Sequence, residues 1–257
     1  MKRKTFSNLS NSLLIFVLVF GWGMFLASGP AHGSSITGGE DTKAKTIKGI
    51  DVSHFSGGVD WETVKTAGYT FAFAKATEGD DLKDPSFQDH WQEIKKAGLT
   101  RGAYHFYVTE DDPKTQAGFF IKNVTLQPGD LIPAVDIESI GRGTTPGVTQ
   151  RLKKFLGILE NHYGIKPIIY TSPRFWNKHL NSHFGTYPLW VAEYGVKEPI
   201  APRGWKEWHL WQWKENAAVP GVEKEADLSI FNHKEKIFSH LLLKGKRGQT
   251  RRREKLK

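Results

Sequence analysis

The sequence of 257 residues contains no cysteine, and this absence excludes several kinds of site at once. Disulfides, thiolate metal ligands, cysteine nucleophiles and a lipidated cysteine are all ruled out. The ten histidines are scattered without the H-E-x-x-H spacing of a zinc hydrolase, and no glycine-rich phosphate loop follows the first expected strand. We therefore predict no metal and no cofactor, and any catalysis must use oxygen and nitrogen side chains.

The middle of the chain lacks an excess of positive charge. The formal net charge is +9, but the first 34 residues carry +3 and the last 14 carry +7, which leaves −1 for the rest. We therefore expect no specific nucleic-acid partner. We expect a basic C-terminal tail at residues 237–257, of which residues 244–257 have no apolar residue but Leu256, cannot fold alone and should be solvated. It could make weak electrostatic contact with anionic envelope polymers.

Long apolar runs are also missing. The longest, from Leu13 to about Ala27, is shorter than the roughly 20 residues of a membrane span. It follows a basic start and precedes Ala31-His32-Gly33, a small-x-small cleavage pattern. Residues 1–33 therefore read as a signal peptide, or as an N-terminal anchor if they are retained. We expect an exported protein, periplasmic or extracellular, with a linker at residues 34–46.

Residues 47–236 show short apolar runs that alternate with amphipathic stretches, the pattern of βα units. Helices are expected at 61–67, 85–97, 115–122 and 148–163. Strands are expected at 49–53, 69–77, 101–107, 131–138, 167–172, 188–194, 207–213 and 226–231. Eight strands favour a single-domain α/β barrel that resembles a TIM barrel, irregular at its helix-poor end, over a doubly wound open sheet. We expect a monomer.

Acidic residues gather at the predicted strand ends, where barrel enzymes build their sites. Within one strand, Asp136 and Glu138 are two residues apart, so both side chains should share a face, about 6 to 7 Å apart. Repulsion between such acids raises one pKa and can produce a general acid for glycosidic cleavage. A salt bridge or a metal site is the alternative. The other acids at strand ends are Asp51, Glu78, Glu193 and Asp227.

Aromatic residues provide a second signal, because rings with one polar group suit a sugar-binding groove. Five of the nine tryptophans lie between Trp190 and Trp213, and tyrosines occur on or beside the expected strands. Packing in the barrel core is the alternative use for most of these rings. The candidate substrate-binding residues are Tyr104, Tyr170, Trp190, Glu193 and Gln212.

Eight short motifs occur in order along the chain: GIDVSHFSG (49–57), FAFAKATEG (71–79), GAYHFY (102–107), PAVDIE (133–138), IIYTS (168–172), LWVAEY (189–194), LWQW (210–213) and ADLSIF (226–231). Together they resemble glycoside hydrolase family 25, the muramidase type of lysozyme. The resemblance implies a barrel of five βα units and three further strands, (β/α)5(β)3. It also implies cleavage of the β-1,4 bond between N-acetylmuramic acid and N-acetylglucosamine, so that peptidoglycan strands are the expected partner.

The resemblance also assigns roles by position. Glu138 corresponds to the general acid, and Asp136 to a partner that either stabilises the transition state or orients the substrate acetamide. Asp51 and Asp227 correspond to the acids on the first and last strands. One motif departs from the family, which commonly has Asn where this chain has Ser229. A chitin-type hydrolase of N-acetylglucosamine polymers and a non-catalytic wall-binding module are the competing functions.

Overall fold

The computed structural model describes residues 46–180, 184–232 and 235–245. The predicted signal, nearly all of the linker and the most basic part of the tail lie outside these residues. Among the helices in the described ranges, none is both long and apolar enough to cross a membrane.

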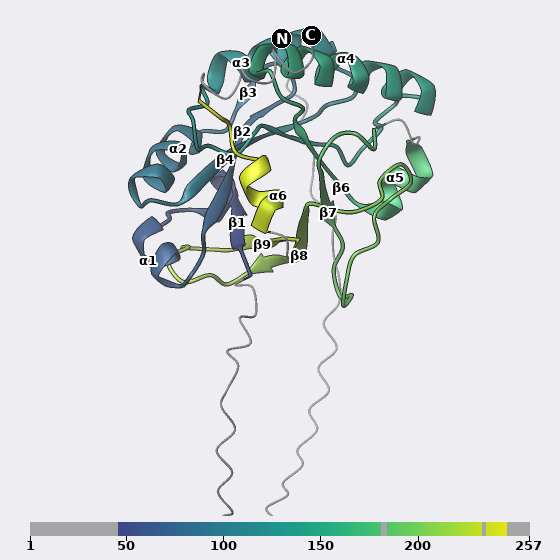
Figure 1. Ribbon diagram of the computed structural model, residues 1–257. Helices are drawn as coiled ribbons and strands as arrows, with labels where there is room; N and C mark the ends of the chain where they lie inside the picture. Colours follow the sequence, from purple (N-terminus) through teal and green to yellow (C-terminus); the bar gives the residue numbers. More distant parts are fainter. Residues whose placement is uncertain (1–45, 181–183, 233–234, 246–257) are drawn as a thin grey trace, which may run out of the picture. The chain divides into compact units, whose positions relative to one another are not determined.

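Eight strands form a closed ring (Figure 1). They are β1 (Lys48–Val52), β2 (Phe71–Glu78), β4 (Thr100–Phe106), β5 (Ala134–Asp136), β6 (Ile168–Thr171), β7 (Leu189–Ala192), β8 (Leu210–Ala217) and β9 (Ala226–Phe231). Neighbours from β1 to β8 are parallel, while β9 is antiparallel to both β8 and β1 and closes the ring between them. The predicted barrel with eight strands is confirmed, and the open sheet is excluded.

Five helices connect the first six parallel strands and lie around the outside of the ring (Figure 1). They are α1 (Trp61–Thr66), α2 (Phe87–Lys96), α3 (Pro113–Asn123), α4 (Thr145–Tyr163) and α5 (Pro173–His179). No helix occurs between β7 and β8 or between β8 and β9 in the described chain, which confirms the (β/α)5(β)3 pattern. Helix α5, which the sequence reading did not predict, starts at a Ser172 cap followed by proline.

Side chains along β2 point alternately to the inside and to the outside of the barrel, and so they contribute to two separate apolar clusters. Phe71 and Phe73 belong to the cluster inside the barrel, whereas Ala72 and Ala74 belong to the cluster between strands and helices. Small residues on the outer face let the helices approach the sheet closely. Inside, the Phe73 ring fills space that Gly102 leaves open, since a Cβ at Gly102 would lie 2.3 Å from it. These rings fill the barrel, so its interior is a core and not a channel.

The C-terminal segment covers the end of the barrel where the parallel strands begin. After α6 (Glu235–His240), Leu241 is buried and its carbonyl accepts a hydrogen bond from the Ile132 amide at 2.9 Å. Leu242 then forms an antiparallel bridge with Leu131. The folded chain therefore continues past residue 237, where the sequence reading began the tail, and we propose that the tail begins near residue 246.

Candidate active site

The carboxyl ends of the parallel strands bring four of the predicted acids to one mouth of the barrel. Asp51 is on β1 and Asp227 is directly opposite it on the antiparallel strand β9. Asp136 is the last residue of β5, and Glu138 follows two residues later. Three of the four predicted catalytic residues thus lie on strands that are far apart in sequence but share one end of the ring, and Glu138 lies just beyond one of these strands.

Strand β5 is shorter than predicted, and this changes the geometry of the Asp136–Glu138 pair. The strand ends at Asp136. The Ile137 amide still donates to the Tyr170 carbonyl at 3.1 Å, but the Ile137 carbonyl accepts from the Thr171 hydroxyl at 2.9 Å and not from a backbone amide. Glu138 therefore lies on the loop beyond the strand and not on the strand itself. Asp136 is buried, with Oδ1 free of any hydrogen-bond partner among the described residues, while Glu138 is exposed at the mouth.

Both members of this pair hold their protons more tightly than free carboxyl groups do. Burial raises the pKa of Asp136 well above its usual value, and repulsion from Glu138 adds to the effect. Loss of hydration also raises the pKa of Glu138, while a hydrogen bond with Asp136 lowers it and repulsion from Asp227 raises it. A carboxyl group whose pKa is raised in this way is suited to act as a general acid.

Gln212 connects the other two acids. Its Nε2 donates to Asp51 Oδ1 at 2.8 Å and to Asp227 Oδ2 at 3.2 Å. Its Oε1 accepts from the Tyr170 hydroxyl at 2.8 Å and also from the Tyr194 hydroxyl. With both donors and both acceptor positions occupied, the amide has one orientation. It holds two carboxyl groups side by side without supplying a positive charge.

Without a neutralising cation, the Asp51–Asp227 pair remains electrostatically costly. Burial raises the pKa of Asp51 well above its usual value, and repulsion from Asp227 raises it further. Burial likewise raises the pKa of Asp227, although the Asn216 amide, which donates to it at 2.8 Å, works in the opposite direction. Groups with such shifted pKa values at a strand end are typical of functional sites and are seldom tolerated elsewhere.

A small hollow opens beside Asp136, and three of the predicted substrate-binding residues line it. Its walls are Asp136, Tyr104, Tyr170 and Trp190, and its volume of about 10 Å³ accommodates one group of about the size of a water molecule. The two tyrosines and the tryptophan thus meet the predicted acid pair directly. Trp190 itself is 2% exposed, so only the edge of its ring is available.

Comparison with known proteins agrees with this geometry. The family model of glycosyl hydrolases family 25 matches residues 50–222. The chain belongs to this family. Lysozyme M1 of Streptomyces globisporus is 35% identical over 199 residues, which is 72% of this chain and 68% of the relative.

Two further relatives extend the comparison. The uncharacterized protein YegX of Escherichia coli K12 is 35% identical over 192 residues, which is 73% of this chain and 70% of the relative. The crystal structure of a lysozyme from Streptomyces coelicolor superposes with a TM-score of 0.72 at 31% identity, over 78% of this chain and 98% of the solved one. As a member of family 25, the protein is a glycoside hydrolase.

Ser229, the departure from the common family 25 sequence, keeps contact with the site despite its short side chain. Its hydroxyl donates to Asp51 Oδ2 at 3.4 Å and accepts from Trp190 Nε1 at 3.1 Å. The residue is fully buried. Serine in this position of the family 25 site therefore still links the first-strand acid to the aromatic residue beneath it.

Glu193 was predicted to bind substrate, but its carboxylate serves the loop after β7. Its Oε2 accepts from the Ile200 amide at 2.8 Å, and its backbone carbonyl accepts from Trp211 Nε1 at 2.7 Å. None of the hydrogen bonds recorded for the described residues joins this side chain to the four acids. Through these contacts, Glu193 stabilises the loop that follows β7 at the edge of the family 25 mouth.

Three residues of the mouth were missed in the sequence reading. Lys75 lies two positions after Phe73 on the inner face of β2 and pairs with Glu78 at 2.6 Å. It lowers the pKa of Asp136 and of Glu138, against the larger effect of burial. Tyr194 bonds Gln212, and Glu215 raises the pKa of Glu138 by repulsion. Side chains alternate between the two faces of a strand, so Phe71, Phe73 and Lys75 share the inner face of β2. This alternation could have predicted that Lys75 points into the barrel.

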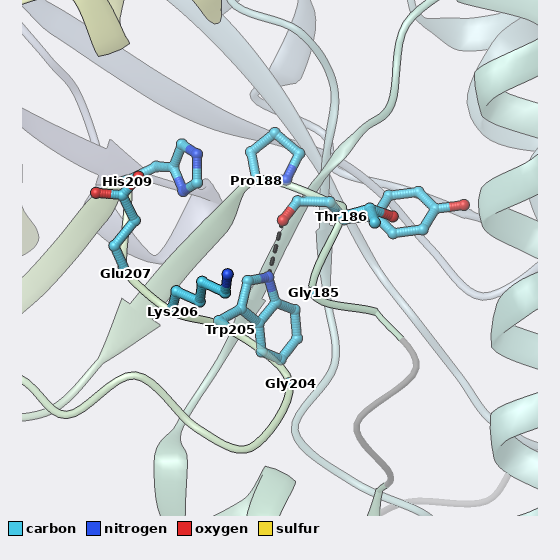
Figure 2. Close-up of a pocket in the computed structure, with 9 residues that line it drawn as sticks. Gly185, Thr186, Pro188, Gly204, Trp205, Lys206, Glu207 and His209 are labelled. Carbon is cyan, nitrogen blue, oxygen red and sulfur yellow. Dashed lines mark hydrogen bonds between the residues drawn. The ribbon is translucent and has the colours of Figure 1, made fainter.

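A larger hollow, of about 530 Å³, lies at the opposite end of the barrel (Figure 2). Pro188, which precedes β7, and His209, which precedes β8, lie on its walls together with Trp205. It contains none of the residues of the family 25 mouth. Across the described residues, no group of three or more histidine, aspartate or glutamate side chains is arranged to hold a metal ion.

Proposed function

We propose that this glycoside hydrolase is a muramidase, which hydrolyses the β-1,4 bond between N-acetylmuramic acid and N-acetylglucosamine in peptidoglycan. The observation that carries the proposal is the pair formed by an exposed Glu138 and a buried Asp136, both with raised pKa values, at the open mouth of a family 25 barrel. Lysozyme M1, which is similar in sequence, and the Streptomyces coelicolor lysozyme, which is similar in fold, support the choice of substrate.

Glu138 is the proposed general acid. Its side chain is the accessible member of the pair, so it can reach the glycosidic oxygen, and its pKa is raised above the usual carboxyl value, as a general acid requires. Transfer of this proton accompanies cleavage of the bond between the glycosidic oxygen and C1. The sugar left behind develops positive charge at C1 and the ring oxygen, and water finally attacks C1.

Asp136 and the hollow beside it are the proposed site for the substrate acetamide. The unpartnered Oδ1 of Asp136 can accept a hydrogen bond from the acetamide N–H after a small rotation of the carboxyl group. The rings of Tyr104, Tyr170 and Trp190 would then surround the methyl group. Stabilisation of the positive C1 by a charged Asp136 is the alternative role, and an Asp136→Asn variant separates the two. An amide still accepts a hydrogen bond but carries no charge.

We propose that Asp51 and Asp227 supply negative charge on one side of the site. Gln212 fixes both carboxyl groups through neutral hydrogen bonds, so that ionisation of one leaves a negative charge that a cationic transition state can use. Burial and repulsion from Asp227 both raise the pKa of Asp51.

We infer that the protein acts outside the cytoplasm, because the composition of residues 1–33 is that of an export signal and its substrate is extracytoplasmic. We expect a monomer that needs no cofactor. The basic residues after 245 would add only a weak attraction to anionic envelope polymers.

Product analysis by mass spectrometry tests the proposal. The full-length protein incubated with purified cell walls should release muropeptides whose new reducing end is N-acetylmuramic acid. A reducing end of N-acetylglucosamine would contradict it. Preferential cleavage of chitin would identify a chitin-type hydrolase, and saturable wall binding without any product would identify a non-catalytic binding module.

A further inference from the structure

Six large apolar side chains are exposed in the described chain: Phe55, Leu82, Tyr194, Val196, Ile200 and Trp213. Leu82 begins the short strand β3 (Leu82–Lys83) and Trp213 lies within β8, while the others lie in the segments that follow β1 and β7. Single exposed apolar residues are common and need no explanation, so the structure around each of them decides whether it has a role.

Phe55 differs from the others because the structure around it holds it firmly in an exposed position. It is 72% exposed and lies in the turn directly after β1, four residues beyond Asp51. The Ser53 hydroxyl accepts from the Phe55 amide at 3.3 Å, and the Ser56 hydroxyl accepts from the Ser53 amide at 3.4 Å. This reciprocal cap closes the turn.

A buried acid outside the catalytic cluster anchors the same turn. Asp84 is fully buried, and its Oδ2 accepts from both the backbone amide of His54 at 3.1 Å and Nδ1 of its ring at 2.7 Å. Its second oxygen accepts from the Ser86 amide at 2.9 Å. The anchored imidazole packs against the Phe55 ring, with 3.9 Å between the ring centres.

The turn is also joined to the loop between β8 and β9, which leads to Asp227. Val59 and Val222 form a bridge, and the Gly58 amide donates to Glu223 Oε2 at 2.7 Å. Phe55 therefore lies on an anchored turn that follows the strand of Asp51 and contacts the loop before Asp227. Its ring is supported on one side by His54 and open to solvent over most of its surface.

We infer that Phe55 is a platform on which a sugar ring of the glycan strand stacks, next to the Asp51–Asp227 side of the mouth. The inference rests on the proposed function for its substrate. A pyranose presents one face of C–H groups to an aromatic ring and its hydroxyls to polar neighbours, and the surroundings of Phe55 provide both. A protein partner would require a larger apolar patch than one ring among Ser53, Ser56 and Glu223.

Three substitutions separate stacking from general apolar contact: Phe55→Ala, Phe55→Leu and Phe55→Trp. Stacking of this kind contributes enough that Phe55→Ala should raise KM for wall fragments about three- to tenfold, with kcat nearly unchanged. Phe55→Trp should restore KM, whereas Phe55→Leu, which keeps the apolar surface without the ring, should not. The matched control is Ile200→Ala, because Ile200 is 71% exposed at the same end of the barrel and has no ring.

Binding of each variant to purified walls, measured by sedimentation, keeps the test independent of catalysis. If the wild type cleaves walls and Phe55→Ala matches it in KM and binding, or if Leu rescues as well as Trp, the platform is wrong while the proposed function stands. If the wild type binds without cleaving and Phe55→Ala loses binding, the proposed function fails and the platform stands. An equal effect of Ile200→Ala would also overturn the inference.

Discussion

The two ends of the barrel treat buried charge in opposite ways. Where the parallel strands begin, Asp130 forms two hydrogen bonds with the Arg101 guanidinium, at 2.9 and 3.1 Å, and that guanidinium lies 3.9 Å above the Trp91 ring. At the mouth, Asp51 and Asp227 face each other with only the neutral Gln212 between them.

This difference shows where stability and function reside. The first end neutralises its acid completely, as a structural ion pair must. The mouth instead tolerates repulsion and buried carboxyl groups, which lowers stability but supplies groups that can give and accept protons near neutral pH. Substitutions at the two ends should therefore have opposite signatures.

The largest effect is expected for Glu138→Gln at the mouth. Removal of the general acid should reduce the rate of wall hydrolysis by about 10²- to 10⁴-fold, because the amide cannot protonate the leaving oxygen. Release of muropeptides over time measures the rate, and the melting temperature should remain near that of the wild type. Activity within threefold of the wild type would remove Glu138 from the mechanism.

At the opposite end, Asp130→Ala should lower the free energy of unfolding without changing the catalytic rate. The variant leaves the buried Arg101 guanidinium without its carboxylate, a loss of about 3 to 5 kcal/mol in the free energy of unfolding. Urea unfolding measures this loss, and kcat of the protein that remains folded should be unchanged. An Asp130→Ala protein with unchanged stability and a low kcat would contradict the assignment of stability to this end of the barrel and of catalysis to the mouth.

The pH dependence of stability should distinguish the mouth acids as well. Because burial raises the pKa of Asp136 above its unfolded value, its contribution to stability is complete below about pH 4 and is lost as pH rises towards the folded pKa. Asp136→Asn should thus be more stable than the wild type at pH 7, by about 1.4 kcal/mol for each pKa unit relieved.

Melting temperatures of both proteins between pH 4 and pH 7 would measure this difference, which should shrink towards zero at the acidic end. A difference that is independent of pH would mean that the substitution acts through packing and not through charge.

The smallest effect is expected for Ser229→Ala. This variant removes the hydroxyl that links Trp190 to Asp51 and leaves a buried indole N–H without a partner, at a cost of about 1 kcal/mol. Urea unfolding measures the cost, and the pH optimum of hydrolysis reports on Asp51. A loss of activity as large as that of Glu138→Gln would show that the hydroxyl takes part in catalysis.

Most of the fold was predictable because periodic patterns are local. The strand at 71–78, with its inward phenylalanines and outward alanines, can be recognised from eight letters. Helix α5 was missed although Ser172 followed by Pro173 is a recognised helix start, and β5 was expected to be longer because hydrogen-bond partners decide where a strand ends. The four acids were predicted because strand ends converge in any parallel barrel.

By itself, the sequence determined the eight strands and the family, and it proposed the four acids as catalytic residues, since these depend on the local pattern and on the order of motifs. Only the tertiary structure decided which acid is exposed and which is buried, that Glu193 serves a loop, and that Lys75 and Tyr194 join the mouth. It also decided that Phe55 is presented on an anchored turn. Burial and many hydrogen-bond partners depend on residues far away in the sequence: His54 bonds Asp84, 30 positions away, and Gln212 bonds Asp51, 161 positions away. The local pattern of residues does not specify such contacts.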